Sequence, residues 1–167
     1  NGVNCINAFA FTKDEEVYIG SDDGVAVISG GTVTIQQQKI ENSIEDILVD
    51  KDDNLWFASS RQGTLLVTNG RFRDISLLAG LDPCIVNTIL YEGDRLYIGH
   101  DRGFMILNEK KYEKIEDPDY DILQGMRIRQ MYLDKKGRMW VCTTGNGLYL
   151  RNEDMTGKHY STAEYKA

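Results

Sequence analysis

Histidine and cysteine, which often carry catalysis or bind metals, are few and scattered in this 167-residue chain. The histidines are His100 and His159, and the cysteines are Cys5, Cys84 and Cys142. They form no CxxC pair and no zinc-site spacing, and the sequence shows no Ser-His-Asp arrangement or phosphate-binding glycine loop. We therefore expect no enzymatic activity, no metal site and no cofactor.

Acidic residues gather in two short runs that could attract a cation. Residues 50–54 superficially resemble a calcium loop, but the glutamate that closes such a loop is absent, since residues 59–62 read Ser-Ser-Arg-Gln. Residues 116–121 form the densest acidic run. We favour a turn for the first run and a solvated linker for the second, with a cation or basic-ligand site as the alternative.

The charge balance argues against nucleic acid and anionic lipid as main partners. The chain has 26 acidic and 19 basic residues, a formal net charge of -7, whereas phosphate binding needs a basic patch. The longest basic cluster, residues 127–138, is interrupted by Asp134 and is expected to be a solvated loop with a few strand positions. No apolar segment has the length of a membrane span, and the first residues do not resemble a signal peptide.

One sequence pattern occurs four times: an aromatic residue in a short apolar run, then a small residue, a polar turn and a glycine. The aromatic residues are Tyr18, Trp56, Tyr97 and Trp140, so the intervals are 38, 41 and 43 residues. Periods near forty residues built from short strands are typical of β-propeller blades. The expected fold is all-β, a β-propeller of four four-stranded antiparallel blades over residues 3–36, 43–75, 85–115 and 127–163.

Turn residues divide each copy into strands. Asp and Asn at residues 50–54 favour a turn, and Gly30-Gly31 and Asn69-Gly70 are two-residue hairpin signals. The expected strands are 6–11, 17–20, 25–29 and 32–36 in the first copy; 44–49, 55–59, 64–68 and 71–75 in the second; 86–91, 95–99, 104–108 and 112–115 in the third; and 128–133, 138–142, 148–151 and 159–162 in the fourth.

Neighbouring blades bury their apolar faces against one another, so equivalent positions of the repeat should be buried alike. We therefore assign Tyr18, Trp56, Tyr97 and Trp140 to packing between blades rather than to an aromatic ligand cage. Cys142 takes the small-residue position after the aromatic and is expected to be buried. A disulfide between Cys5 and Cys84 is possible but disfavoured, because their blades are not neighbours.

Polar residues that differ between the copies are the candidates for ligand binding. One set lies just inside each inner strand, where a propeller channel would open: Asn7, Glu45, Asn87 and Arg129. The other lies in the turn between the second and third strands: Asp22, Arg61, His100, Arg102 and Asn146. We favour ordinary solvated loop positions for both sets, with ligand binding as the alternative.

The repeat resembles the two-component regulator propeller repeat. Residues 50–56 read Asp-x-x-x-Asn-Leu-Trp and residues 134–140 read Asp-x-x-Gly-Arg-Met-Trp, each followed by a small residue and a glycine-led strand. Residues 80–83, Gly-Leu-Asp-Pro, are similar to the linker between blades of that family. The first and third copies depart from the pattern, because they have tyrosine instead of tryptophan and lack the aspartate.

The resemblance implies an extracytoplasmic sensor segment, periplasmic or at the cell surface, of a membrane-anchored receptor whose intracellular output module is a histidine kinase or a diguanylate cyclase. Such propellers sense small molecules, often glycans. Four blades are few for this family, so the chain resembles a partial propeller of a larger sensor region. The blades could close, remain open, or pair with a second copy into a larger ring, which we prefer.

Two main hypotheses about function follow. The chain is a non-catalytic ligand-sensing or dimerisation segment of a signalling receptor, or it is a protein-interaction scaffold without a small-molecule ligand. A propeller lyase is a remote third hypothesis. The expected partners are a small-molecule or glycan ligand and a homodimer or neighbouring blades.

Overall fold

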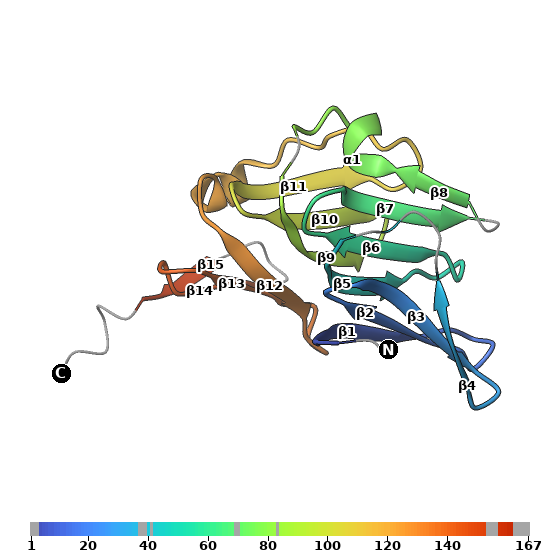
Figure 1. Cartoon of the computed structure of the whole chain (residues 1–167). Helices are drawn as coiled ribbons and strands as arrows, with labels where there is room; N and C mark the ends of the chain where they lie inside the picture. Colours follow the sequence, from blue (N-terminus) through green and yellow to red (C-terminus); the bar gives the residue numbers. More distant parts are fainter. Residues whose placement is uncertain are drawn as a thin grey trace. The chain divides into compact units, whose positions relative to one another are not determined.

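The computed structural model describes residues 4–36, 40, 42–68, 71–82, 84–152 and 157–161. Within these ranges β-strands dominate, as Figure 1 shows. The chain divides into two compact units, Asn1–Ile89 (unit 1) and Leu90–Ala167 (unit 2). The boundary between the units falls inside one strand of the third blade.

Unit 1 contains the first two blades, each an antiparallel meander in which every strand pairs with the next (Figure 1). Blade 1 consists of β1 (Ile6–Phe11), β2 (Val17–Ser21), β3 (Gly24–Ser29) and β4 (Thr32–Gln36). Blade 2 consists of β5 (Ile44–Val49), β6 (Leu55–Ser59), β7 (Gly63–Thr68) and β8 (Arg71–Asp74), and the single-turn helix α1 (Ile75–Leu78) follows it. The predicted hairpin at Gly30-Gly31 is confirmed, since both glycines have positive φ and Ser29 pairs with Thr32. The hairpin predicted at Asn69-Gly70 lies outside the described residues.

The third blade consists of β9 (Val86–Glu92), β10 (Arg95–His100) and β11 (Gly103–Asn108), in the order β11-β10-β9. The fourth strand predicted at 112–115 is reduced to an isolated bridge between Leu107 and Lys114. The physical reason is the long turn before it: the Asn108 side chain accepts hydrogen bonds from two turn amides, and Tyr112 has a φ of +57°, which leaves few residues to pair.

Blade 4 consists of β12 (Ile128–Leu133), β13 (Met139–Thr143), β14 (Leu148–Arg151) and β15 (Gly157–Tyr160). Its last strand lies two residues earlier than the predicted 159–162, and residue 162 is outside the described ranges. The 3-10 helix η1 (Pro118–Leu123) lies in the connection that precedes this blade. The prediction of an all-β chain with four antiparallel blade sheets is confirmed.

In blades 2 and 4, one aspartate fixes both a turn and the aromatic residue of the next strand. Asp50 accepts two backbone amides of its turn, each at 2.9 Å, and the indole N–H of Trp56 at 2.9 Å. Asp134 likewise accepts two turn amides, at 2.8 and 3.1 Å, and the indole N–H of Trp140 at 3.0 Å. The hydrogen bond from Arg138, followed by that from Trp140, lowers the pKa of Asp134. The aspartate and the tryptophan occur in the same copies because they bond to each other.

The core of unit 1 lies between the two blades. One face of blade 1 contributes Ala10 and Val25, with Ala8 and Tyr18 partly buried beside them. The facing side of blade 2 contributes the larger residues of this cluster, which are Ile44, Ile47, Leu55, Phe57 and Leu65, with Val49 and Val67 at its margin. Each sheet therefore has one face that covers the following blade and another that can be covered by the preceding one.

Unit 2 repeats this arrangement. Tyr97, Phe104 and Ile106 of the third blade pack against residues of blade 4, which are Ile128, Met131, Met139, Val141 and Tyr149. Helix η1 adds Tyr120 and Leu123 to the same cluster. The rings of Phe104 and Tyr120 are stacked, with centroids 4.6 Å apart.

The close approach of blade 1 to blade 2 makes a testable prediction at Gly20. A Cβ atom at this position would lie 2.6 Å from Cγ2 and 3.0 Å from Cβ of Ile44. We expect Gly20→Val to destabilise unit 1 by about 2 kcal/mol, because the strands would have to separate. Urea unfolding followed by tryptophan fluorescence measures the effect, because Trp56 lies in unit 1 and Trp140 in unit 2. The control is Cys142→Val at the equivalent, exposed position of blade 4, and equal losses in both variants would contradict the prediction.

The prediction that the four repeated aromatic residues are buried alike is wrong in part. Trp56 and Tyr97 are fully buried, but Tyr18 and Trp140 are half-buried. The expectation of a buried Cys142 is also wrong, since this thiol is exposed. Trp140 and Cys142 alternate with Met139 and Val141 along β13, so they point to the face of blade 4 opposite the core of unit 2. None of the three cysteines forms a disulfide.

Candidate functional site

Three of the residues predicted to line a channel mouth are unpaired residues of β-bulges. The register of the inner strand shifts between Ile6 and Ala8, between Ile44 and Asp46, and between Ile128 and Gln130. The residues that these shifts leave without a paired partner are Asn7, Glu45 and Arg129. A bulge redirects a side chain away from the regular alternation of a strand, which explains why polar residues are tolerated inside apolar inner strands.

In unit 1 the two predicted sets of ligand-binding residues meet. The Nδ2 group of Asn7 donates to Oδ1 of Asp22 at 3.0 Å and to Oγ of Ser43 at 3.2 Å. Ser43 donates to Asp22 at 3.2 Å or to Oε1 of Glu45 at 2.7 Å. The hydrogen bond from Asn7, followed by that from Ser43, lowers the pKa of Asp22. We call these four residues the Asn7 cluster; Ser43 was not predicted, although it directly precedes an inner strand.

The remaining predicted residues lie apart. Arg61 is exposed in the turn between β6 and β7, and Asn87 is buried in β9. Arg129 and Asn146 are exposed, on β12 and in the turn after β13. His100 and Arg102 meet, since Nδ1 of His100 accepts the backbone N–H of Arg102 at 3.3 Å.

His100 is suited to a structural role rather than to proton transfer. Its side chain is buried, and this burial, together with the charge of Arg102, lowers the pKa of the imidazole. At neutral pH the ring is therefore neutral and accepts the Arg102 amide at the turn.

A hollow of about 410 Å³ opens in unit 2 between η1 and the outer strands of blade 4. Its volume is in the range of small-molecule sites. We call it the η1 hollow. Its walls are mostly apolar and aromatic, and they include Tyr120, Ile122, Tyr149, Arg151, Lys158 and His159.

Aromatic rings form two sides of the η1 hollow. Tyr149 and His159 face each other as cross-strand partners, with ring centroids 4.1 Å apart and planes within 10°. Nε2 of His159 contacts the backbone oxygen of Asn146, which orients this imidazole. Tyr120 lies on η1 and Tyr149 on β14, so aromatic faces from two elements line one space.

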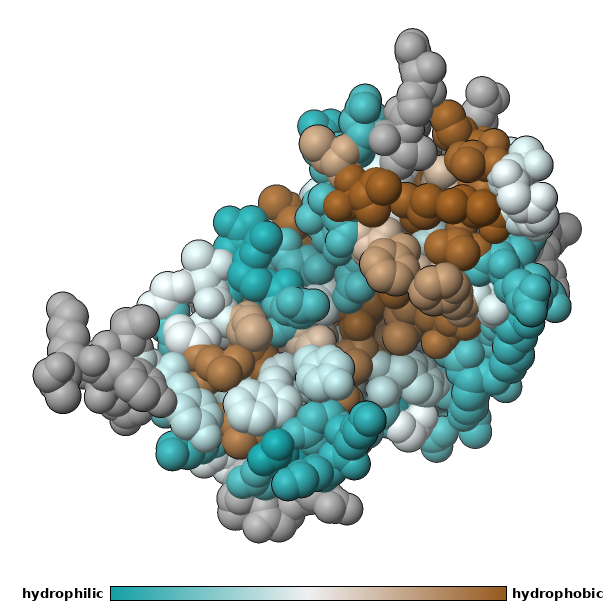
Figure 2. Space-filling view, turned by 90° about the horizontal axis from the view of Figure 1, so that it is seen from below, coloured by the Kyte–Doolittle hydropathy of each residue, from teal (hydrophilic) through white to brown (hydrophobic). Residues whose placement is uncertain are grey.

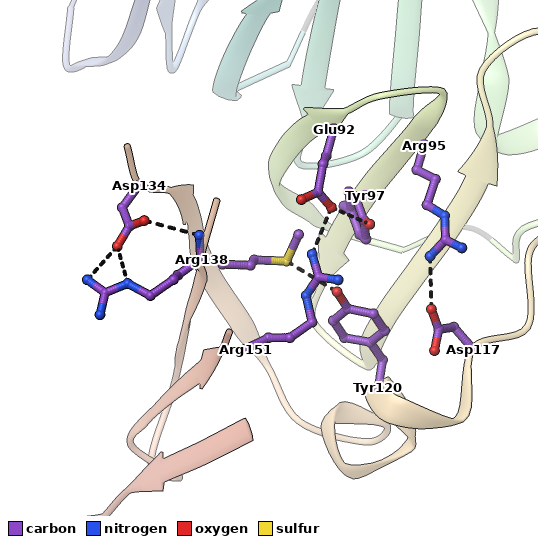
Figure 3. A network of polar contacts seen from close by, with 9 residues as sticks. Glu92, Arg95, Tyr97, Asp117, Tyr120, Asp134, Arg138 and Arg151 are labelled. Carbon is purple, nitrogen blue, oxygen red and sulfur yellow. Dashed lines mark hydrogen bonds and ion pairs between the residues drawn. The ribbon is translucent and has the colours of Figure 1, made fainter. Parts of the chain in front are cut away.

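A charged network connects two residues that line the η1 hollow, Tyr120 and Arg151, to the third blade, and Figure 3 shows its contacts. The Arg151 guanidinium lies 2.7 Å from Oε2 of Glu92 and over the ring of Tyr120, 5.4 Å from its centroid. The Tyr97 hydroxyl donates to the same glutamate oxygen at 2.8 Å. The ion pair and the cation–π contact thus join β9, β14 and η1 and hold Tyr120 in place.

The tyrosines of this network are hydrogen-bond donors, not bases. Burial raises the pKa of Tyr120 and of Tyr97, and the hydrogen bond to Glu92 adds to the shift at Tyr97. Both hydroxyls are therefore protonated at neutral pH, and that of Tyr120 donates to Sδ of Met139 at 3.8 Å. This arrangement can orient a bound molecule but offers no activated nucleophile or general base.

The η1 hollow was not predicted from the sequence. Tyr120 lies in the acidic run that we interpreted as a solvated linker, and Arg151 ends a strand. The linker interpretation accounts for the exposed residues Glu116 and Asp121 but misses the aromatic side chain between them. In the described part of the chain no three His, Cys, Asp or Glu side chains are grouped as a metal site would need. Likewise, none of the described helices has the length and apolar character to cross a membrane.

Comparison with solved structures shows the propeller fold. The chain is similar to the extracellular domain of BT3049, named as a hybrid two-component system of B. thetaiotaomicron, with a TM-score of 0.83 and 20% identity over 98% of this chain. The corresponding domain of BT4673 from the same organism gives 0.75 and 18% over 98%. The chain spans 23% of the length of each of these structures, so its four blades form a partial propeller.

A propeller enzyme is also similar in fold. Virginiamycin B lyase from Staphylococcus aureus has a TM-score of 0.70 and 11% identity over 96% of this chain and 57% of its own length. No curated protein sequence matches the chain. The sequence description of the two component regulator propeller, however, matches residues 38–61 and 122–145.

The two matched segments cover the inner strands and turns of blades 2 and 4, the blades in which an aspartate holds a tryptophan. The resemblance stated from the repeat is confirmed. The chain is thus a β-propeller segment in which blades 2 and 4 are similar to the two-component regulator propeller repeat.

Proposed function

We propose that this chain is a non-catalytic ligand-sensing segment of a membrane-anchored signalling receptor and lies outside the cytoplasm. The family match supports a regulatory role, and the B. thetaiotaomicron structures with this fold are named as extracellular domains of hybrid two-component systems. The observation that carries the ligand-sensing part is the η1 hollow, an aromatic-lined space of about 410 Å³ whose lining residue Arg151 is held by an ion pair with Glu92.

The chemistry of the η1 hollow favours a short saccharide as the ligand. The stacked rings of Tyr149 and His159 line the hollow and offer a flat aromatic surface, against which the C–H face of a sugar ring can lie. The cation of Lys158 at its border favours a sugar that carries a carboxylate. Binding would link η1 to the outer strands of blade 4, which gives a ligand a means to change the stability of unit 2.

A thermal-shift and calorimetric titration with trigalacturonate, and with maltotriose as the uncharged probe, tests this proposal. We expect the acidic trisaccharide to stabilise the chain by ~2.7 kcal/mol at one hundred times its Kd. Ile122 is exposed at the border of the hollow, so Ile122→Asp should retain the fold and repel the carboxylate. Leu77→Asp, on the exposed side of α1, is the matched control.

The outcomes separate the two hypotheses. Binding that Ile122→Asp abolishes and Leu77→Asp retains supports a saccharide site in the η1 hollow. If neither trisaccharide binds, or if Ile122→Asp leaves binding unchanged, the ligand-sensing proposal is contradicted and the interaction scaffold is favoured.

A further inference from the structure

One face of blade 1 is strongly apolar and exposed. Ile6, Phe9 and Phe11 of β1 are 60%, 63% and 65% exposed, and Val33 and Ile35 of β4 continue this face. The Phe9 and Phe11 rings contact each other edge to face, with centroids 5.7 Å apart. Figure 2, which views the molecule from below Figure 1, shows a continuous hydrophobic area on the side where β1–β4 lie. We call this surface the outer face of blade 1.

The repeat shows what normally covers this face. In blade 2 the positions equivalent to Ile6 and Phe9 are Ile44 and Ile47, which are 0% and 7% exposed. They are buried because the opposite face of blade 1, with Ala10 and Tyr18, packs on them. In unit 2 the equivalent Ile128 and Met131 are buried in the same way against the third blade. The outer face of blade 1 therefore has large apolar residues at the positions that a neighbouring blade buries in blades 2 and 4.

The chain also carries a face of the covering type. In blade 4 the positions equivalent to Ala10, Tyr18 and Gly20 are Tyr132, Trp140 and Cys142. Tyr132 and Cys142 are exposed, and Trp140 is half-buried and stacked on Tyr160 with centroids 6.4 Å apart. We call this surface the far face of blade 4. Exposed aromatic residues that gather on one sheet face mark an interaction surface.

Charges at the turns match as well. Between blades 1 and 2, Lys13 meets the turn of the following blade, since its Nζ donates to the backbone oxygen of Lys51 at 2.9 Å and its backbone N–H to Asp53 at 3.3 Å. The equivalent turn of blade 4 carries Lys135 and Lys136, and the equivalent turn of blade 1 carries Asp14 and Glu15. Repeating this contact would place two lysines beside two carboxylates.

We propose that a second copy of this chain docks head to tail, with the far face of its blade 4 on the outer face of blade 1. The contact is heterologous, because it joins two different surfaces. It repeats the packing that already exists within each unit. In this contact the aromatic residues on the far face of blade 4 cover the outer face of blade 1 of the other copy. Lys135 and Lys136 in the turn of blade 4 then pair with Asp14 and Glu15 in the turn of blade 1.

A mixing experiment with two variants tests the direction of docking. Phe9→Asp blocks the outer face of blade 1, and Tyr132→Asp blocks the far face of blade 4; both residues are exposed, so both variants should fold. By sedimentation velocity we expect the unmodified chain to self-associate with rising concentration and each variant alone to stay at the 19.0 kDa monomer. An equimolar mixture should form a dimer, because one intact face of each kind remains.

A disulfide trap tests the register. Because a Cβ at Gly20 would lie 3.0 Å from Cβ of Ile44, Cys142 of one copy should reach a cysteine at position 6 of the next. In a Cys5→Ser, Cys84→Ser background, Ile6→Cys should give a cross-linked dimer on mild oxidation. Leu77→Cys in the same background is the exposed control and should give at least tenfold less.

Some results would overturn the proposal. An unmodified chain that sediments as a monomer at every concentration, together with cross-linking of Ile6→Cys no greater than that of Leu77→Cys, would show that the outer face of blade 1 takes a different occupant. Association of Tyr132→Asp alone would show docking of two outer faces, and it would exclude the head-to-tail arrangement.

Discussion

Replacing Phe57 by alanine is expected to destabilise unit 1 by about 4 kcal/mol, among the larger losses that a single side chain can cause. Phe57 is 1% exposed and lies in β6, whose five residues are all buried. Its ring belongs to the cluster that joins blades 1 and 2, so truncation leaves a cavity at the interface between two sheets. Such a loss approaches the whole stability of many small domains.

Urea unfolding in a Trp140→Phe background measures this effect, because Trp56 then reports on unit 1 alone. Phe57→Leu is the conservative control, and we expect it to retain more than half of the lost stability. Ile19 occupies the equivalent but half-buried position of blade 1. At protein concentrations at which the chain is monomeric, Ile19→Ala should therefore lower the free energy of unfolding much less. Similar losses for Phe57→Ala and Ile19→Ala would show that the interface between the blades is not the main source of stability.

Asp50→Ala is expected to have the second largest effect, a loss of about 2 to 3 kcal/mol. The carboxylate accepts the buried indole N–H of Trp56, two backbone amides and the side-chain amide of Asn54, at 3.0 Å in its shorter contact. Alanine leaves these donors without their acceptor, some of them away from water. Asp50→Asn keeps one acceptor oxygen and should lose less.

The dependence of the free energy of unfolding on pH in the acidic range tests the role of the same carboxylate. Burial alone would raise the pKa of Asp50, but the hydrogen bonds from Trp56 and Asn54, with those of the backbone, outweigh it and lower the pKa below the ordinary 3.8. The native state therefore holds the proton more weakly than the unfolded state. The contribution of Asp50 is complete above pH 3.8 and is lost as the pH falls toward the lowered value.

We therefore expect the free energy of unfolding to fall less steeply below pH 3.8 in Asp50→Asn than in the unmodified chain. Urea titrations at a series of acidic pH values, with Trp56 fluorescence as the signal, measure this difference. A variant with the same pH dependence as the unmodified chain would mean that Asp50 has the same pKa in the folded and unfolded states.

Much of the fold could be predicted because it is local and repeated. The strands follow from alternating apolar residues between turn residues, and four copies of one pattern reinforce each other. The third blade departs from the pattern because the turn closed by Asn108 uses residues that a shorter hairpin would have left for pairing. Turn geometry of this kind depends on a few backbone angles that residue types only weakly specify.

The candidate site was predicted only in part. Asn7 and Asp22 were chosen as variable polar residues of two separate sets, and the structure joins them through Ser43. The η1 hollow escaped prediction because Tyr120 and Arg151 are 31 residues apart and meet only when the connection before blade 4 packs against its outer strands. Nothing in their local sequence marks that contact.

The sequence by itself determined the repeat, the strand order within each blade and the joint occurrence of aspartate and tryptophan in blades 2 and 4, because these depend on residues close along the chain. Tertiary structure decided which copies of an equivalent residue are buried. Ile47 and Phe9 occupy the same place in their blades, yet one is 7% and the other 63% exposed. The difference arises because burial depends on a neighbouring sheet: blade 1 packs on the face of blade 2 that carries Ile47, whereas Phe9 lies on the exposed outer face of blade 1.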